Sequence, residues 1–222
     1  MISKLPRWVW WGAFVLAAVG GMVNVVGLLG FEHQAITHLT GTTTMLGAAI
    51  GEGNAGRALH FAAMIGAFLA GTALSGWLVE DSVLKLDGRY YLALGLEAVL
   101  LLAAVPLLWK GREAGLYAAS CACGLQNAMV STYSGAVVRT THLSGMFTDL
   151  GIFFGHWLRG IPVDVRRLKL CGSVISGYGL GAVAGTVAFR SLGYSALVVP
   201  AGIVAMIGAG SVVFKRRREP QA

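Results

Sequence analysis

Long runs of apolar residues, interrupted by short charged segments, form the main pattern of the chain. A membrane-spanning helix needs about 20 mostly apolar residues. Six segments reach this length with few charges: 8–30, 58–79, 90–109, 114–135, 171–189 and 193–214. Gly-rich and charged segments at 79–89 and 110–115 separate some of them, and 156–169, with Pro162, predicts the main cytoplasmic loop. The pattern predicts an all-α polytopic membrane protein with about six transmembrane helices.

Composition and charge support a lipid environment. The 222 residues are 56% hydrophobic and only 12% charged, against roughly 25% charged in soluble domains. The net charge of +7 is compatible with nucleic-acid binding by its size alone. The basic residues, however, flank apolar runs: Lys4 and Arg7 precede the first, and Lys215 to Arg218 follow the last. This placement is typical of helices anchored at a membrane surface, so we expect the lipid bilayer, and no nucleic acid, as a partner.

Two similar polar segments lie outside the six predicted helices. The first polar segment, 37–47, reads THLTGTTTMLG, and the second polar segment, 141–151, reads THLSGMFTDLG. Each follows a long helix and precedes another. The sequence therefore predicts two pseudo-symmetric halves, 1–112 and 113–222, each with three spanning helices and one interrupted or re-entrant polar segment.

Residues around the polar segments support this internal repeat. Asn24 precedes Thr37 by 13 residues, and Asn127 precedes Thr141 by 14. The sequence Phe68-x-x-Gly71 in the second predicted helix has a counterpart in Tyr178-x-x-Gly181 in the fifth. Chance similarity between apolar sequences is the alternative explanation.

The orientation depends on whether the polar segments cross the membrane. Re-entrant segments give six crossings and inverted halves, whereas full crossings give eight and parallel halves. In both cases all but four of the 17 Lys and Arg residues lie on the side of the termini, so the positive-inside rule predicts cytoplasmic termini. Each polar segment offers only about 16 residues before a charge, too few for an ordinary bilayer. This length favours six crossings and two re-entrant segments.

The polar segments carry residues that start helices. Thr40 or Thr42 is expected to cap a short helix that runs to about Ile50, and Ser144-Gly145 is the equivalent in the second half. Helix N-termini near the bilayer midplane hold substrates in many secondary transporters, because their free N–H groups and dipole favour anionic or polar groups.

His38 and His142 adjoin these predicted helix starts. Histidine donates or accepts a hydrogen bond or carries a proton near neutral pH. These two either line the site and bind substrate or relay protons, or they bond a neighbouring helix and hold the interrupted segment in shape. The other three, His33, His60 and His156, have no such pairing and are expected at the interface. The spacing between His33 and His38 is wrong for one helix face, and no metal or cofactor is expected.

Two acidic residues stand out. Glu97 lies inside the third apolar run, where a carboxylate costs about 2.5–3.5 kcal/mol on insertion scales and usually faces a cavity. It is the proton-coupling candidate, with a hydrogen-bonded structural role as the alternative. Asp149 aligns with Met45 of the first half and is expected near the interface.

Glycine-rich stripes favour close helix packing. Small residues recur four apart in Gly66-x-x-x-Ala70, Gly71-x-x-x-Ser75 and Gly177-x-x-x-Gly181-x-x-x-Gly185. They predict contacts inside the molecule, with a homo-oligomer seam as the alternative.

The paired motifs resemble the YoaK-like family of bacterial inner-membrane proteins, a domain-of-unknown-function family. The resemblance rests on MVNVVGLL with THLTGTTTMLG, and on GLQNAMV with VVRTTHLSGMFTDLG, and it covers nearly the whole chain. It implies a multi-pass protein of the bacterial inner membrane and no defined activity. Asn24 stands where the family often has an acidic residue, and Thr42 where Asn is frequent. A proton-coupled mechanism that needs that carboxylate is therefore not carried over to this chain.

The sequence as a whole predicts a secondary transporter or channel for a small polar solute. No nucleotide-binding, serine-hydrolase or zinc motif is present, so no enzyme is predicted. A membrane scaffold that binds partners through its small-residue faces is the alternative, followed by an enzyme built on His38, His142 and Glu97. The predicted substrate-binding residues are Asn24, Thr37, His38, Thr40, Gly41, Thr42, Gln126, Asn127, Thr141, His142, Ser144 and Gly145.

Overall fold

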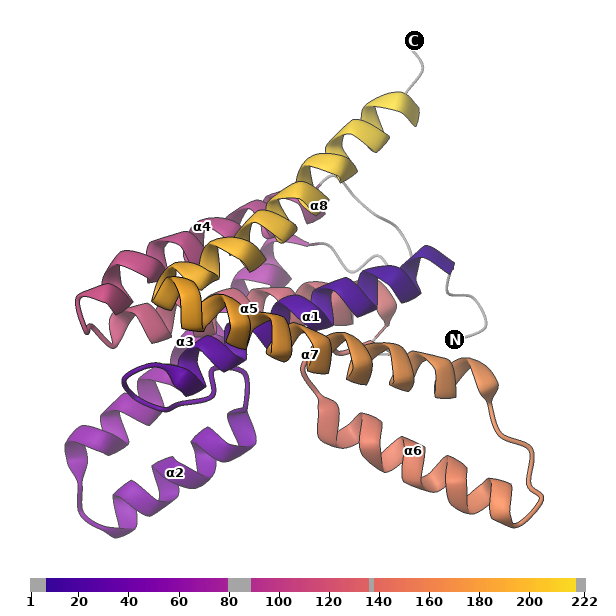
Figure 1. Cartoon of the computed structure of the whole chain (residues 1–222), viewed down its shortest axis with the longest axis horizontal. Coiled ribbons are helices and arrows are strands. Elements are labelled where there is room, and N and C mark those ends of the chain that lie inside the picture. The colour runs from indigo at the N-terminus through magenta and orange to yellow at the C-terminus, as the bar shows by residue number, and fades with distance from the viewer. Residues whose placement is uncertain (1–6, 80–88, 136–137, 219–222) are drawn as a thin grey trace.

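A computed structural model of the chain describes residues 7–79, 89–135 and 138–218, and these ranges contain helices and no strands (Figure 1). The all-α prediction is confirmed. In order, the elements are α1 Arg7–Leu29, α2 Leu39–Gly51, α3 Ala55–Leu78, α4 Tyr90–Trp109, α5 Ala114–Ser134, α6 Leu143–Leu158, α7 Val165–Leu192, the short 3₁₀ helix η2 Gly193–Leu197 and α8 Val198–Arg218.

Four stretches of the described residues are long and apolar enough to cross a membrane. They are Val9–Leu29, Ala55–Leu78, Tyr90–Trp109 and Val165–Ser211, the last of which contains α7, η2 and most of α8. The chain is therefore a multi-pass membrane protein. The predicted segment 114–135 matches α5 in position but is not among the four. Its buried Ser120 and Gln126 lower its hydropathy, and protein rather than lipid surrounds them because α3 and α4 pack against α5.

The connections differ from the prediction in one place. The segment 156–169 is mostly helical, since α6 continues to Leu158 and the next helix begins at Val165. The Asp164 side chain accepts hydrogen bonds from the backbone N–H groups of Arg166 and Arg167, which fixes the early start of α7. The predicted connection at 79–89 lies mostly outside the described residues.

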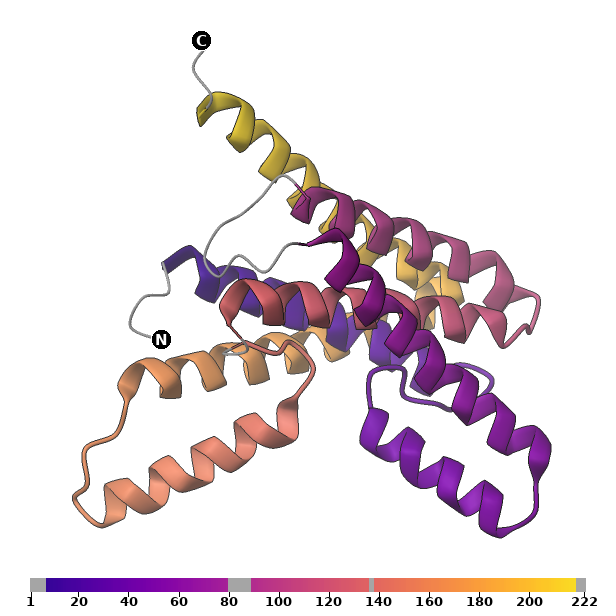
Figure 2. The ribbon, with the colours of Figure 1, turned by 180° about the vertical axis from the view of Figure 1, so that it is seen from behind.

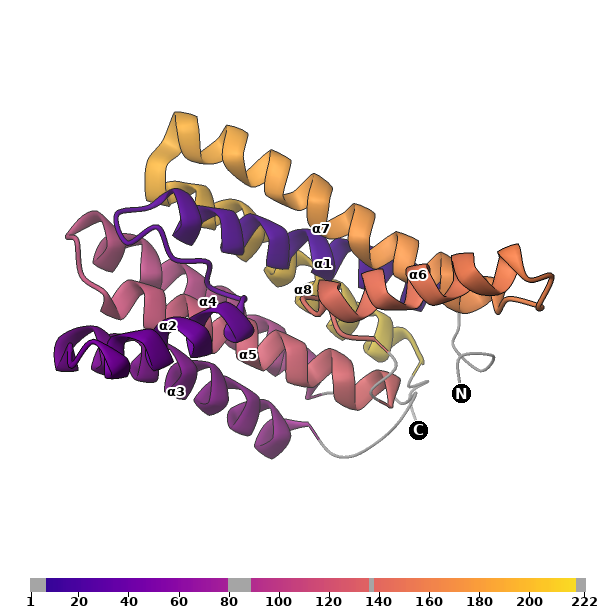
Figure 3. The same cartoon turned by 90° about the horizontal axis from the view of Figure 1, so that it is seen from below.

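Two helices begin in the middle of the bundle instead of at its ends. Most helices run along the long dimension of the molecule, but α2 and α6 start near the centre and project towards opposite ends (Figures 1 and 2). The first residues of α1 and the last of α8 lie at the same end. Seen from below, α2 and α6 flank a central region in which α1 and α5 lie between α3 and α7 (Figure 3).

Backbone-to-backbone contacts at glycines join helices that are far apart in sequence. On α1 and α7, a Cβ at Gly21 would overlap the carbonyl oxygen of Tyr178, and one at Gly181 would overlap that of Ala18. Such contacts bring helix axes closer than side chains normally allow. The close packing of α1 on α7 therefore depends on residues without a side chain.

The contact between α3 and α5 repeats this arrangement. A Cβ at Gly71 would overlap the carbonyl oxygen of Cys121, and one at Gly124 would overlap that of Phe68. The Gly66 stripe differs, because Gly66 and Ala70 are exposed and a Cβ at Gly66 would meet nothing within 4 Å. The prediction of internal packing is thus confirmed for the stripes at Gly71, Gly177, Gly181 and Gly185, and the Gly66 stripe faces outward.

Substituting Gly71 tests this packing. We expect Gly71→Ala to lower the free energy of unfolding by at least about 1 kcal/mol, because its methyl group forces α3 away from α5. Thermal unfolding of the purified protein in detergent measures the effect. Gly66→Ala, on the same helix, is the matched control and is expected to be neutral or slightly stabilising, since Ala favours helix. Equal stability of the two variants would contradict the close α3–α5 contact.

Candidate functional site

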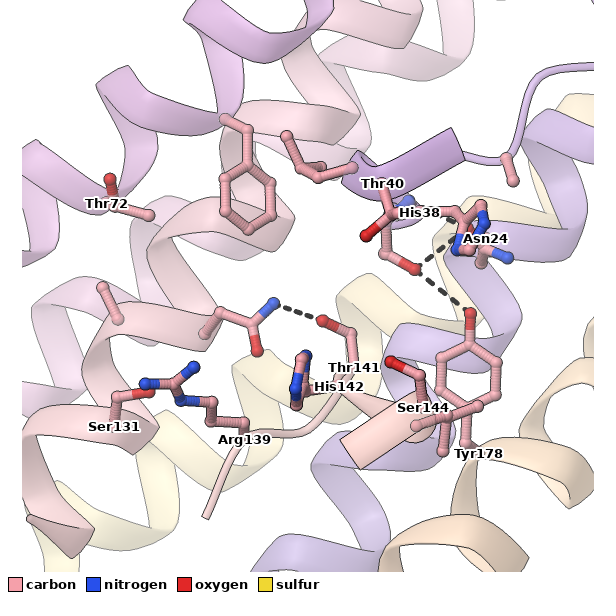
Figure 4. A pocket seen from close by; sticks show the side chains of 17 residues that line it. Asn24, His38, Thr40, Thr72, Ser131, Arg139, Thr141, His142, Ser144 and Tyr178 are labelled. Atoms are coloured by element: carbon pink, nitrogen blue, oxygen red, sulfur yellow. Dashed lines mark hydrogen bonds between the residues drawn. The ribbon is translucent and has the colours of Figure 1, made fainter. Parts of the chain in front are cut away.

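The two polar segments meet in one cavity of about 710 Å³. Its walls come from α1, α2, α3, α5, α6 and α7 and from the loops before α2 and α6 (Figure 4). The lining residues are Asn24, Ala35, Thr37, His38, Leu39, Thr40, Phe68, Thr72, Asn127, Ala128, Ser131, Arg139, Thr141, His142, Leu143, Ser144 and Tyr178. Residues about 100 positions apart in sequence therefore share one space.

Asn24 on α1 holds the first polar segment in place. Its Oδ1 accepts hydrogen bonds from the backbone N–H of Thr37 at 2.8 Å and from the Thr37 hydroxyl at 2.9 Å. The Tyr178 hydroxyl on α7 lies 3.1 Å from the same Thr37 oxygen. These bonds satisfy a loop that runs back into the bundle, where an unpaired backbone group costs several kcal/mol.

Asn127 on α5 holds the start of the second polar segment through threonine side chains. Its amide nitrogen donates to the Thr141 hydroxyl, and its carbonyl oxygen accepts from Thr140 at 3.2 Å. The Gln126 carbonyl also accepts from Thr140, at 3.3 Å. Gly20 on α1 leaves room for this loop, since a Cβ there would lie 2.9 Å from the Thr141 methyl carbon. Each loop therefore contacts both halves of the chain.

The helix starts differ from the prediction by a few residues. His38 is the N-cap of α2 and His142 the N-cap of α6, with nearly identical backbone angles (φ −92°, ψ 66° and φ −91°, ψ 60°). The expected caps Thr40, Thr42 and Ser144-Gly145 lie inside the helices. Thr42 instead donates its hydroxyl to the carbonyl oxygen of His38, four residues earlier. The helices extend back because the Asn24 and Asn127 contacts hold the preceding threonines.

The spacing His-x-x-Gly has a steric reason. The His38 ring lies over Gly41, where a Cβ would overlap its Cδ2 atom. The His142 ring lies over Gly145 in the same way, with Nε2 2.7 Å from the position of a Cβ. Neither imidazole makes the usual side-chain cap bond. The glycines therefore let each imidazole lie against the first turn of its own helix while remaining exposed to the cavity.

Eight of the twelve predicted substrate-binding residues line this cavity, and four do not. Asn24, Thr37, His38, Thr40, Asn127, Thr141, His142 and Ser144 line it, whereas Gly41 and Gly145 lie behind the imidazoles. Thr42 is buried and accepts a hydrogen bond from Gln34. Gln126 is buried behind Thr140, with its amide nitrogen unpartnered among the described residues. These positions support the lining without facing it.

Glu97 also lies outside the cavity lining. It is only 2% exposed on α4, and its Oε2 atom has no hydrogen-bond partner among the described residues. The structure therefore brings His38 and His142 into one cavity but does not add Glu97 to them.

Nine lining residues were not predicted as site residues: Ala35, Leu39, Phe68, Thr72, Ala128, Ser131, Arg139, Leu143 and Tyr178. Phe68 and Tyr178 had a signal, because they occupy equivalent places beside Gly71 and Gly181. That signal was interpreted as a sign of an internal repeat, and these two side chains also reach the cavity. Arg139 precedes His142 by three residues and is exposed, so a charge so near a polar segment was a further signal.

The remaining polar clusters lie outside this cavity. Asp149 on α6 forms a two-pronged ion pair with Arg167 on α7, with contacts of 3.0 and 3.2 Å. His60, expected at the interface, is buried, and its Nδ1 lies 2.9 Å from Glu113. The Tyr117 hydroxyl donates to the same carboxylate at 2.6 Å. Among the residues described, no cluster of three or more His, Cys, Asp or Glu is placed to hold a metal ion.

The histidine positions can be tested by nuclear magnetic resonance on protein labelled at histidine. We expect Gly41→Ala to shift the His38 imidazole signal, because the added methyl displaces the ring from the helix start. The signal is assigned by its loss in His38→Gln. Gly47→Ala, on the same helix with nothing within 4 Å of an added Cβ, is the control and should leave the signal in place. An unchanged signal in Gly41→Ala would refute the stacked position.

The stability of the fold depends on pH through Glu113. Glu113 precedes α5, and the Tyr117 hydrogen bond and then the His60 contact lower its pKa from the ordinary value of about 4.5. A lowered pKa adds stability that is complete above the ordinary pKa and is lost as the pH falls below it. We expect the melting temperature of wild type to exceed that of Glu113→Gln at neutral pH and the gap to narrow below about pH 4.5. Glu52→Gln is the control. A difference in melting temperature between wild type and Glu113→Gln that does not change with pH would contradict the contacts of Glu113 with Tyr117 and His60.

The comparisons with known proteins agree with the resemblance seen in the sequence. No curated protein and no solved structure matches the chain. A family model described as "Protein of unknown function (DUF1275)" matches residues 12–210, which is most of the chain. This is the YoaK-like family of membrane proteins, and the chain belongs to it.

Proposed function

We propose that the chain is a secondary transporter or channel that passes a small polar solute through the cavity between the polar segments. The observation that carries this proposal is the convergence of both segments on one cavity of about 710 Å³. Ligand sites usually occupy about 300–1,000 Å³.

The physics of the bilayer supports this function. Irregular backbone at membrane depth is tolerated where protein or water covers it. The hydrogen bonds of Asn24 and Asn127 cover the loops, but the exposed side chains of His38, Thr40, His142 and Ser144 still face the cavity. A purely structural break gains nothing from polar side chains left open to a cavity, whereas a solute site needs them.

The arrangement also favours re-entrant polar segments and inverted halves. The first spanning helix of each half packs on the second spanning helix of the other half, α1 on α7 and α5 on α3. The helices α2 and α6 begin centrally and project towards opposite ends, as two inverted re-entrant segments do (Figure 1). With six crossings, Arg57, Lys110, Arg112 and Arg190 lie opposite the termini. The positive-inside rule then supports cytoplasmic termini, in the inner membrane that the family resemblance implies.

The alternative functions have less support. A scaffold that uses its glycine faces needs them free, but Gly71, Gly177, Gly181 and Gly185 are taken up by internal contacts. Among the stripes named above, the outward Gly66 stripe is the one left to bind a partner or a second copy of the chain. An enzyme built on His38, His142 and Glu97 lacks support because Glu97 does not line the cavity.

Transport can be tested with the purified protein in liposomes. We expect wild type to speed the passage of at least one small polar solute over protein-free liposomes in a stopped-flow light-scattering screen, run with and without a pH gradient. Replacing both His38 and His142 by Gln should reduce that flux at least tenfold with the fold retained, because both imidazoles line the cavity.

His156→Gln is the matched control, since this histidine of α6 does not line the cavity. Gly66→Leu tests the scaffold alternative, because it enlarges the outward stripe and leaves the cavity lining unchanged. The proposal fails if folded wild type passes none of the small polar solutes in the screen. It also fails if the variant that lacks both histidines passes the transported solute at the wild-type rate.

A further inference from the structure

The charge on the cavity walls has one sign. Arg139 is the one Arg or Lys among the described lining residues, and none of those residues is Asp or Glu. Its side chain lies with Ser131 and His142 at one part of the cavity (Figure 4). A cationic solute would meet a like charge there, whereas an anionic group would meet an unopposed guanidinium.

Two helix starts add to this positive potential. The first N–H groups of an α-helix have no intrahelical partner, and the starts of both α2 and α6 lie at the same cavity. In neither helix does the N-cap side chain accept from these groups. Each helix end carries a partial positive charge of about half an elementary charge, so both reinforce the field of Arg139.

The first polar segment is preceded by no such charge. Ala35 lies two residues before Thr37, as Arg139 lies two residues before Thr141, so a methyl group stands at the place equivalent to the guanidinium. Ala35, Leu39, Phe68 and Ala128 give the lining an apolar portion. The cavity thus combines one strong anion-binding group with apolar surface.

We propose, on the basis of the transport function above, that the solute is a small organic anion whose charged group is held by Arg139 and the starts of α2 and α6. Arginine binds carboxylate and phosphate through paired N–H donors. The hydroxyls of Thr40, Ser131 and Ser144 supply further donors from the lining. A neutral polar solute can bond these hydroxyls but gains nothing from the positive charge, and a cation meets no carboxylate among the described lining residues.

Binding measured without transport tests the anion class. The purified full chain in detergent is titrated with sodium acetate, sodium propionate, methyl phosphate, glycerol or urea at constant ionic strength, and the melting temperature and the heat of binding are followed. We expect a saturable shift with at least one of the anions and none with the neutral solutes. Comparing acetate and propionate with methyl phosphate shows whether the site prefers a carboxylate or a phosphate group.

Variants of Arg139 locate the site. Arg139→Gln should weaken anion binding at least tenfold, and Arg139→Lys should restore part of it because the charge returns without the paired donors. Arg190→Gln, at an exposed arginine outside the cavity, is the matched control and should bind as wild type does. Equal binding by wild type and Arg139→Gln, binding of neutral solutes only, or binding of no anion in the panel would overturn the inference.

The outcomes also separate this inference from the proposed function. Anion binding that depends on Arg139, in a protein that passes no solute through liposomes, supports the site and refutes transport. Flux of a neutral solute that depends on His38 and His142, without anion binding, supports transport and refutes the anion class.

Discussion

The structure depends on how two broken helices satisfy their backbone groups inside an apolar bundle. Each loop returns towards the centre, where an unpaired amide costs several kcal/mol. Asn24 meets this need in the first loop by accepting the Thr37 backbone N–H, whereas Asn127 holds the second loop through the hydroxyl groups of Thr140 and Thr141. Because these loops end at the centre, α2 and α6 begin there, and their first residues line a cavity. The polar cavity is therefore a direct consequence of how the breaks are anchored.

Close packing at glycines turns these two anchored breaks into one site. The helix that carries Asn24 packs on α7, which contributes Tyr178, and the helix that carries Asn127 packs on α3, which contributes Phe68. Gly20 also leaves room on α1 for the Thr141 methyl group. Each polar segment is thus positioned by helices from both parts of the chain. A change in the distance between α1 and α7 therefore alters the cavity wall as well as the bundle.

The sequence predicted the helices better than the site for physical reasons. A spanning helix requires a long apolar run, so α1, α3 and α4 were placed to within three residues. The caps of α2 and α6 were wrong because propensity favours Thr or Ser at a helix start, whereas the tertiary contacts of Thr37 and Thr141 extend the helix back to a histidine. Tyr178 was missed as a lining residue because its contact with Thr37 joins positions 141 apart. The relative rotation of α7 and α1 that creates this contact has no local sequence signal.

The two halves hold their polar segments with different side chains, and this difference bears on mechanism. Thr37 is held by Asn24 and Tyr178, but Phe68, at the place equivalent to Tyr178, has no hydroxyl to offer Thr141. Gln126 instead supports Thr140, where the first half has Val23 at the position equivalent to Gln126. Arg139 likewise stands at the place equivalent to Ala35. In the proposed site, a charge that has no counterpart at Ala35 would favour one orientation of a solute with one charged end and one apolar end. On the proposed transport function, the two directions of passage would then begin from different bound geometries.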